Sequence, residues 1–127
     1  MLDKEKAVLI VDDTMMMREG LRRVLASMGY ENTVQAEHGK QAVKIVESGE
    51  HDFGVVFLDI VMPVMDGKEA LKKIREINKD LPVVMVTSKA DKDSIVECSK
   101  LGMNGYVLKP INAAEGPGIL EEIFSRL

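Results

Sequence analysis

The sequence of 127 residues has one cysteine, no tryptophan and no long apolar run. Because Cys98 has no second cysteine to pair with, we expect a reducing compartment, the cytoplasm. The longest nearly apolar stretch, residues 55–65, is shorter than the roughly 20 apolar residues that a membrane-spanning helix requires, so we expect no membrane contact. There is no excess of basic residues either, since 17 lysines and arginines stand against 21 acidic residues, and we expect no direct nucleic-acid partner.

Five short apolar runs alternate with five longer amphipathic segments. Three of the runs are nearly continuous in apolar residues, which is typical of strands buried on both faces of a parallel sheet. The predicted strands cover residues 7–11, 33–36, 53–58, 82–87 and 105–108. This alternation predicts an α/β fold, a doubly wound five-stranded parallel sheet with helices on both faces, formed by a single domain over residues 1–127.

The segments between the runs carry the signals of helices. Apolar residues repeat at helical spacing over residues 17–28, and Gly29 directly after them predicts the end of a first helix. Asp66 with Glu69 three residues later resembles a capping box, which predicts the start of a third helix. We interpret the methionines at residues 15–17 as flexible apolar filler at the start of the first helix, with a soft surface for a protein partner as the alternative.

The last two predicted helices have weaker signals. Asp91 or Asp93 is expected to open the fourth helix, whose apolar stripe is sparse. At the start of the fifth, Gly116, Pro117 and Gly118 follow one another, and glycine and proline cost about 1 and 3 kcal/mol in a helix interior. We therefore expect this helix to begin late, near Gly116 or Pro117.

Polar residues follow four of the predicted strands at the points where they end. In open sheets of this kind, functional residues gather beyond the carboxyl ends of the strands, so we expect these side chains to share one crevice. They are Asp12 and Asp13 after the first strand, Asp59 after the third, Thr87 and Ser88 at the end of the fourth, and Lys109 with Pro110 after the fifth.

Three carboxylates in one crevice would repel one another, by roughly 4 kcal/mol for two unit charges about 4 Å apart at an effective dielectric constant near 20. Lys109 supplies one positive charge, and a divalent cation would bring the sum of charges to zero. Carboxylate oxygens without histidine or cysteine nearby favour Mg2+ or Mn2+ over zinc. Since a carboxylate can also act as a nucleophile toward phosphorus, the sequence predicts phosphoryl transfer to an aspartate beside a metal ion.

The residues at these strand ends, together with residues 58–67, resemble the signature of two-component response-regulator receiver domains, the CheY-like family. The resemblance extends in order over essentially the whole chain. It implies a flavodoxin-like (βα)5 fold and a signalling switch, not an enzyme, in which phosphorylation changes a protein-binding surface. It also implies a histidine kinase or a histidine phosphotransfer protein as the phosphodonor, an output protein whose identity stays open, and a monomer or weak dimer.

The resemblance further implies an acceptor and a set of metal ligands. Asp59 is expected to accept the phosphoryl group. Mg2+ is expected to be held directly by Asp13 and Asp59, largely through water by Asp12, and by the backbone carbonyl of Val61.

The remaining roles that the resemblance implies concern the fourth and fifth strand ends. Lys109 is expected to contact a phosphoryl oxygen, with a cis peptide bond between Lys109 and Pro110. Thr87 is expected to follow the phosphoryl group inward, with Ser88 beside it. Tyr106 matches an aromatic switch position whose rotamer is coupled to Thr87.

Other interpretations stay open. Asp12 and Asp13 also stand where helix N-cap residues occur. The chain could be a receiver that has lost phosphorylation and acts as a static binding module. An aspartyl-nucleophile phosphatase of the haloacid-dehalogenase type is disfavoured, because it needs a second aspartate where Thr14 stands. A flavodoxin is disfavoured too, because its first loop should be rich in serine, threonine and glycine to bind phosphate.

The resemblance also generates a prediction about the lifetime of the phosphorylated state. In the family, the positions of Val61 and Lys89 border the path of the water that hydrolyses the acyl phosphate. Because valine has no polar group to orient that water, we expect slow self-dephosphorylation, and we expect Val61→Asn to release phosphate several-fold faster than the wild type. Parallel measurements of phosphate release test this, and equal rates would exclude a role for the side chain.

Overall fold

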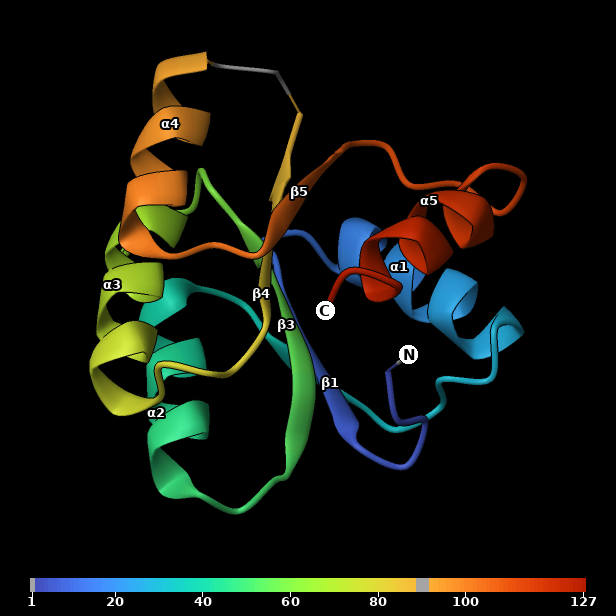
Figure 1. Cartoon of the computed structure of the whole chain (residues 1–127), viewed down its shortest axis with the longest axis horizontal. Helices are drawn as coiled ribbons and strands as arrows, with labels where there is room; N and C mark the ends of the chain where they lie inside the picture. Colours follow the sequence, from blue (N-terminus) through green and yellow to red (C-terminus); the bar gives the residue numbers. More distant parts are fainter. Residues whose placement is uncertain (1, 89–91) are drawn as a thin grey trace.

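The computed structural model describes residues 2–88 and 92–127, and within them five strands alternate with five helices (Figure 1). The strands are β1 (Ala7–Val11), β2 (Thr33–Ala36), β3 (Phe53–Asp59), β4 (Val83–Thr87) and β5 (Gly105–Leu108). The helices are α1 (Met15–Ser27), α2 (Gly39–Ser48), α3 (Gly67–Ile77), α4 (Lys92–Leu101) and α5 (Gly116–Phe124). No helix in this described part of the chain is long and apolar enough to cross a lipid bilayer.

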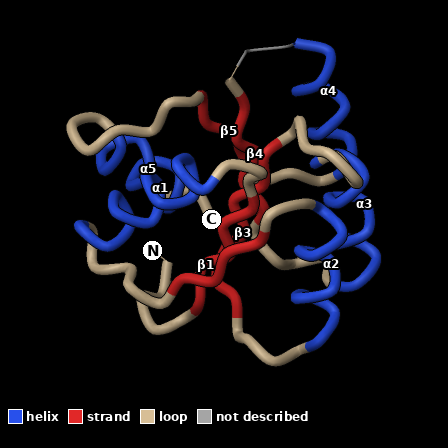
Figure 2. Tube along the Cα trace, turned by 180° about the vertical axis from the view of Figure 1, so that it is seen from behind, coloured by secondary structure: helices blue, strands red, loops and turns tan. Residues whose placement is uncertain are grey.

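These strands form one parallel sheet in the order β2-β1-β3-β4-β5, which confirms the predicted fold class. Helices α1 and α5 cover one face of the sheet, and α2, α3 and α4 cover the other (Figures 1 and 2). β1, β3 and β4 are inner strands, and β2 and β5 form the edges. The carboxyl ends of β1 and β3 are therefore adjacent. Asp12 and Asp13 follow β1, and Asp59 is the last residue of β3.

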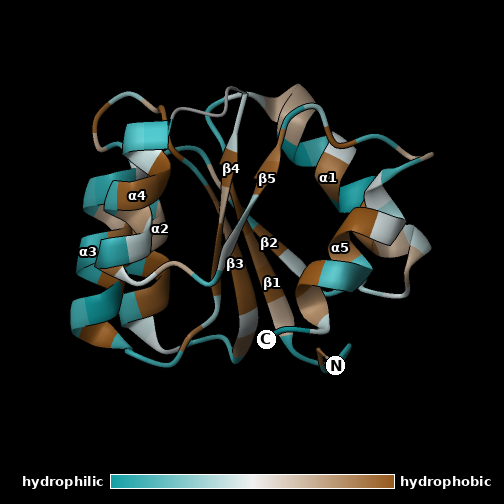
Figure 3. Ribbon diagram, turned by 45° about the horizontal axis from the view of Figure 1, so that its top comes forward, coloured by the Kyte–Doolittle hydropathy of each residue, from teal (hydrophilic) through white to brown (hydrophobic). Residues whose placement is uncertain are grey.

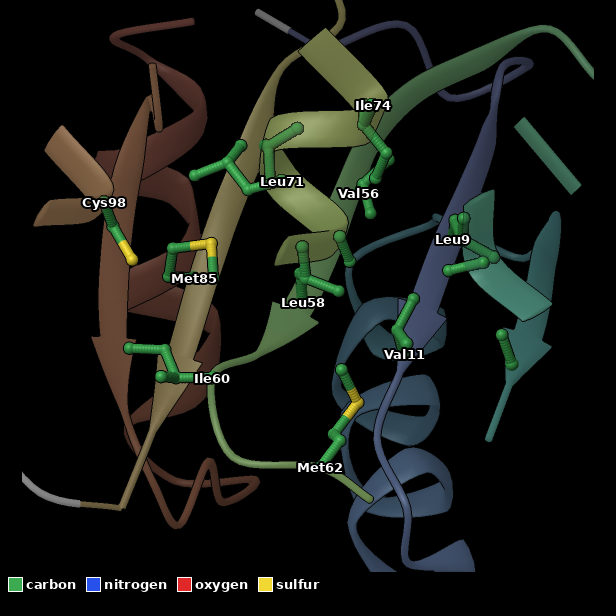
Figure 4. Close-up of a cluster of buried hydrophobic side chains, with 14 of the residues drawn as sticks. Leu9, Val11, Val56, Leu58, Ile60, Met62, Leu71, Ile74, Met85 and Cys98 are labelled. Carbon is green, nitrogen blue, oxygen red and sulfur yellow. The ribbon is translucent and has the colours of Figure 1, made fainter. Parts of the chain in front are cut away.

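The inner strands are apolar because both of their faces are covered (Figure 3). Every residue of β1 and β4 is buried. Since successive side chains of a strand point to opposite faces, the sheet contributes to two separate cores. One core, which includes Leu9, Leu58 and Met85, lies under α2, α3 and α4 (Figure 4). The other includes Phe57 and Phe124 and lies against α1 and α5.

The predicted strand limits agree closely with the structure. The predictions for β1, β2 and β5 coincide with the observed strands. β3 extends one residue further than predicted, to Asp59. β4 begins one residue later, at Val83, because Pro82 has no N–H group to donate to a neighbouring strand.

The predicted helix ends are also confirmed. α1 is followed by Gly29, whose φ of 94° lies in the left-handed region that glycine adopts without strain. The Asp66 carboxylate accepts a hydrogen bond from the Glu69 backbone N–H at 2.9 Å, as a helix cap requires. α5 begins at Gly116, where a Cβ atom would lie only 2.9 Å from Cγ1 of Val24 on α1. The glycine therefore allows the start of α5 to lie directly against α1.

The interpretation of the methionine run as filler is wrong for its first two residues, whereas Met17 is half-buried. Met15 and Met16 are 68% and 83% exposed. Helical spacing explains this, because it places them on the outward face of α1 that also carries Glu19 and Arg23, away from the buried stripe. For α4, the observed helix begins at Lys92, and Asp91, one of its two predicted starts, lies outside the described residues.

One arginine connects the elements at the amino edge of the sheet, the side on which the amino ends of the parallel strands lie. Arg75 of α3 donates hydrogen bonds through Nε to the Gly102 carbonyl at 3.0 Å and through Nη1 to the carbonyls of Leu81 at 2.6 Å and Asn78 at 3.1 Å. Its Nη2 donates to the side-chain oxygen of Asn104 at 2.8 Å. A single guanidinium thus ties the end of α4 to the residues that precede β4 and β5.

Replacing this arginine should destabilise the fold. We expect Arg75→Met to lower the free energy of unfolding by about 3 kcal/mol, because hydrogen bonds to a charged group contribute about 1.5–3 kcal/mol each and their partners would be left unsatisfied. The matched control is Arg126→Met, which removes an exposed ion pair with Glu122 and should change stability by less than about 0.5 kcal/mol. Urea unfolding measures both, and similar effects of the two changes would contradict the proposed anchoring.

Candidate functional site

Two carboxylates are buried at the carboxyl edge of the sheet. Val11 lies opposite Leu58 in the pairing of β1 with β3, so the residues that follow them, Asp12 and Asp59, are side by side. Asp12 is 5% exposed and Asp59 is 4% exposed, whereas Asp13 is exposed. One carboxylate oxygen from each of the three aspartates lies within 4.8 Å of the other two. The structure therefore brings the three predicted acidic residues together.

The Lys109 ammonium lies between the two buried carboxylates. Its Nζ is 2.6 Å from Oδ2 of Asp12 and 3.1 Å from Oδ2 of Asp59, and the lysine side chain is 15% exposed. The backbone N–H of Lys109 donates to the Thr87 carbonyl at 2.7 Å, and the peptide bond to Pro110 is cis. Because β5 is an edge strand, the lysine reaches from it across β4 to the ends of β3 and β1.

Burial has the largest effect on the pKa of Asp59. It raises this pKa above the ordinary value of a carboxyl group; the charge and hydrogen bond of Lys109 act to lower it, the charge of Asp12 acts to raise it, and a backbone hydrogen bond with Val61 acts to lower it. Burial also acts to lower the pKa of Lys109, but the hydrogen bonds and charges of Asp12 and Asp59 outweigh it, so that this pKa is raised. The lysine stays charged, and its single charge does not balance two buried carboxylates.

A turn after β1 fixes the side chain of Asp12. Its Oδ1 accepts hydrogen bonds from the Thr14 backbone N–H at 2.9 Å and from the Thr14 hydroxyl at 3.1 Å, while Oδ2 contacts Lys109. Thr14, not Asp12 or Asp13, occupies the N-cap position of α1. The interpretation of the two aspartates as simple helix caps is therefore wrong.

The other residues named from the sequence lie around this cluster at different depths. Thr87 is buried, 7% exposed, at the end of β4, and the following Ser88 is exposed. Tyr106 is 44% exposed on β5, where it pairs with Met85. Since Met85 is two residues before Thr87, the side chains of Tyr106 and Thr87 point to the same side of the sheet.

The loop after β3 contains two features that the sequence analysis did not identify. Val64 has a φ of 70°, a conformation that β-branched residues rarely adopt, and its side chain is 76% exposed. At Gly67 a Cβ atom would lie 2.1 Å from the carbonyl oxygen of Asp59. The side chain of Val61 in this loop is 78% exposed, and Lys89, named with it above, lies outside the described residues.

The donor chemistry of the acidic cluster fits a small, hard cation. Asp12, Asp13 and Asp59 offer only carboxylate oxygens, the ligands that Mg2+ prefers in proteins. No other group of three or more acidic, histidine or cysteine residues in the described part of the chain is arranged closely enough to hold a metal ion. These three aspartates are therefore the residues that fit Mg2+.

The chain is similar in sequence to known proteins over nearly its whole length. The model of a protein family described as the response regulator receiver domain matches residues 8–121. The chemotaxis protein CheY-3 of Vibrio cholerae serotype O1 is 41% identical over 128 residues, covering 99% of this chain and 97% of that protein. The chemotaxis protein CheY of Pseudomonas aeruginosa is 41% identical over 122 residues, covering 94% and 97% of the two chains.

Solved structures with the same fold include two that contain a metal ion. A chain of the CheX–CheY–BeF3–Mg2+ complex from Borrelia burgdorferi matches with a TM-score of 0.84 and 30% identity, covering 94% of this chain and 87% of that one. The receiver domain of the histidine kinase CKI1 from Arabidopsis thaliana, in complex with Mg2+ and BeF3, matches with a TM-score of 0.82 and 28% identity, covering 95% and 91%.

The contact between Gly67 and Asp59 leads to a prediction. We expect Gly67→Ala to destabilise the protein by about 2 kcal/mol or more, because the new methyl group must displace either the end of β3 or the start of α3. The control is Gly118→Ala in the first turn of α5, where a Cβ atom meets nothing within 4 Å and stability should be unchanged or slightly higher. Urea unfolding of the two variants tests this, and an unaffected Gly67→Ala would show that the close approach is not constraining.

Proposed function

The chain belongs to the response regulator receiver domain family, and on this premise we propose that Asp59 is the phosphoryl acceptor of a phosphorylation-activated switch in a two-component system. The observation that carries the proposal is the setting of Asp59. Its carboxylate is buried at the end of an inner strand, in contact with Lys109 and close to Asp12 and Asp13. We propose a histidine kinase or a histidine phosphotransfer protein as the donor of the phosphoryl group.

In the proposed reaction, a carboxylate oxygen of Asp59 forms a bond to phosphorus. The bond between phosphorus and the imidazole nitrogen of the donor histidine breaks, and the imidazole leaves with the bonding electron pair. The positive charge of Lys109, 3.1 Å from Oδ2, favours the ionised form of Asp59 and lies within reach of the oxygens of an incoming phosphoryl group. The buried position excludes water from most of the carboxylate.

Mg2+, or Mn2+ in its place, is the proposed cofactor. Asp12, Asp13, Asp59 and the backbone carbonyl of Val61 are the residues that would hold it, and when bound it supplies positive charge that offsets the charge of the transferring phosphoryl group. The chain's own contribution is to fix the donors before the metal arrives. The turn at Thr14 and the ion pair with Lys109 do this for Asp12.

The proposed output surface lies next to the acidic cluster, on β4, β5 and α5. Thr87 and Ser88 adjoin the site at the end of β4, and Tyr106 shares a sheet face with Thr87. Large apolar side chains are exposed nearby on β5 and α5: Tyr106 is 44%, Leu108 48% and Ile119 43% exposed. We propose that phosphorylation changes this surface toward an output protein. A monomer or weak dimer in the cytoplasm is the proposed working form.

A chemical phosphodonor tests the acceptor directly. With acetyl phosphate and Mg2+, we expect the wild type to gain the mass of one phosphoryl group. Asp59→Asn should gain none, because an amide oxygen is not a comparable nucleophile, and removal of Mg2+ should reduce the wild-type adduct at least about tenfold.

The control for this experiment is Asp52→Asn. Asp52 is an exposed aspartate directly before β3, at the opposite end of the strand from Asp59, and its replacement should leave the adduct unchanged. An adduct of undiminished yield on Asp59→Asn would reject Asp59 as the acceptor. Absence of any adduct on the wild type, together with no binding of beryllofluoride, would favour a static binding module.

A further inference from the structure

A buried arginine lies behind the acidic cluster. Arg18 is in the second turn of α1 and is 7% exposed, whereas Arg22, one helical turn further on, has a side chain that is 40% exposed. A charged group is costly to bury unless hydrogen bonds replace its water. Arg18 donates through Nη1 to the carbonyl oxygen of Asp12 at 2.7 Å and through Nε to the side-chain oxygen of Gln35 at 2.9 Å. Neither partner is a carboxylate.

The contact with the Asp12 carbonyl constrains the next residue. The carbonyl of Asp12 and the N–H of Asp13 belong to one planar peptide unit, so a guanidinium that holds the oxygen also fixes the direction in which the chain enters Asp13. The carboxylate of Asp13 accepts no hydrogen bond from the described residues, whereas that of Asp12 is held by Lys109 and Thr14. The position of the Asp13 carboxylate therefore depends on its backbone.

Arg18 also differs from Lys109 in the way its charge is used. The lysine occupies Oδ2 of Asp12 and of Asp59. The arginine places its positive charge one peptide group away, on a carbonyl, and leaves every carboxylate oxygen of the cluster free of its own hydrogen bonds. It can therefore reduce the repulsion among three carboxylates without competing for the oxygens that a cation would use.

We propose that Arg18 is a positioning residue for the acidic site. It holds the Asp12–Asp13 peptide so that both carboxylates converge with Asp59 on a divalent cation, and Gln35 of β2 holds the guanidinium in place. The inference rests on the proposed function, because it concerns the affinity of the same site for Mg2+. A purely structural role would instead lower stability and leave Mg2+ affinity as it is.

The experiment measures the dissociation constant for Mg2+ by calorimetric titration of purified variants, with the free energy of unfolding determined in parallel. Arg18→Met keeps the apolar stem and removes the charge and both hydrogen bonds. We expect it to bind Mg2+ about tenfold more weakly or worse, as is typical when a group that orients a metal ligand is lost. Arg18→Lys, which restores the charge with a single donor, should recover part of that loss.

Two control variants separate positioning from folding. Arg23→Met lies on the same helix but on its exposed face, and should change the Mg2+ dissociation constant less than twofold. Arg75→Met removes a guanidinium that also binds backbone carbonyls, at the other edge of the sheet, and should lower stability without changing Mg2+ affinity. The fluorine NMR signal of bound beryllofluoride provides a second readout, which should broaden or weaken in Arg18→Met alone.

The outcomes are distinguishable. A folded Arg18→Met variant whose Mg2+ dissociation constant stays within twofold of the wild type overturns the inference and leaves the proposed function intact. If Arg18→Met does not fold, Gln35→Met takes its place, because it frees the guanidinium without removing it; weaker Mg2+ binding supports the inference and unchanged binding overturns it. A wild type that binds no Mg2+ overturns the proposed function and this inference together.

Discussion

The bridge from the Lys109 ammonium to the carboxylates of Asp12 and Asp59 is the contact on which the rest of the site depends. Two carboxylates less than a tenth exposed cannot lie side by side without a cation between them. The lysine meets this need only in part, since burial still raises the pKa of Asp59. The two buried carboxylates therefore carry more negative charge than the single charge of Lys109 neutralises. A divalent cation bound to these carboxylates would offset this excess, and the buried Arg18 places a further positive charge on the carbonyl of Asp12.

The backbone around Asp59 is as constrained as its charge. The loop after β3 returns so closely that Gly67, the first residue of α3, lies against the carbonyl of Asp59. Val64 in the same loop has a left-handed backbone, which costs a residue with a side chain about 1–2 kcal/mol. Such strain persists only where the surrounding structure over-determines the conformation, as it often does at functional sites. The loop thus holds Asp59 in place at the cost of some stability.

Arginines that bind backbone carbonyls stabilise the two opposite edges of the sheet. Arg75 at the amino edge connects the end of α4 to the start of β4. Arg18 at the carboxyl edge connects α1 to the turn after β1. Of the α4 residues, Cys98 is the one that is buried, and Arg75 binds the carbonyl of Gly102 directly after the helix.

The sequence alone determined the order of strands and helices, the fold class and the acidic, hydroxyl and basic residues at the strand ends. These depend on local periodicity and on the rule that parallel strands end at one edge. Only the tertiary structure decided which groups touch. The reach of Lys109 to Asp12, the burial of Arg18 and the close approach of Gly67 to Asp59 each join segments that are not neighbours in the chain. The exposure of Met15 was missed because a methionine fits a core and a surface equally well, and only the rotation of α1 against the sheet separates the two.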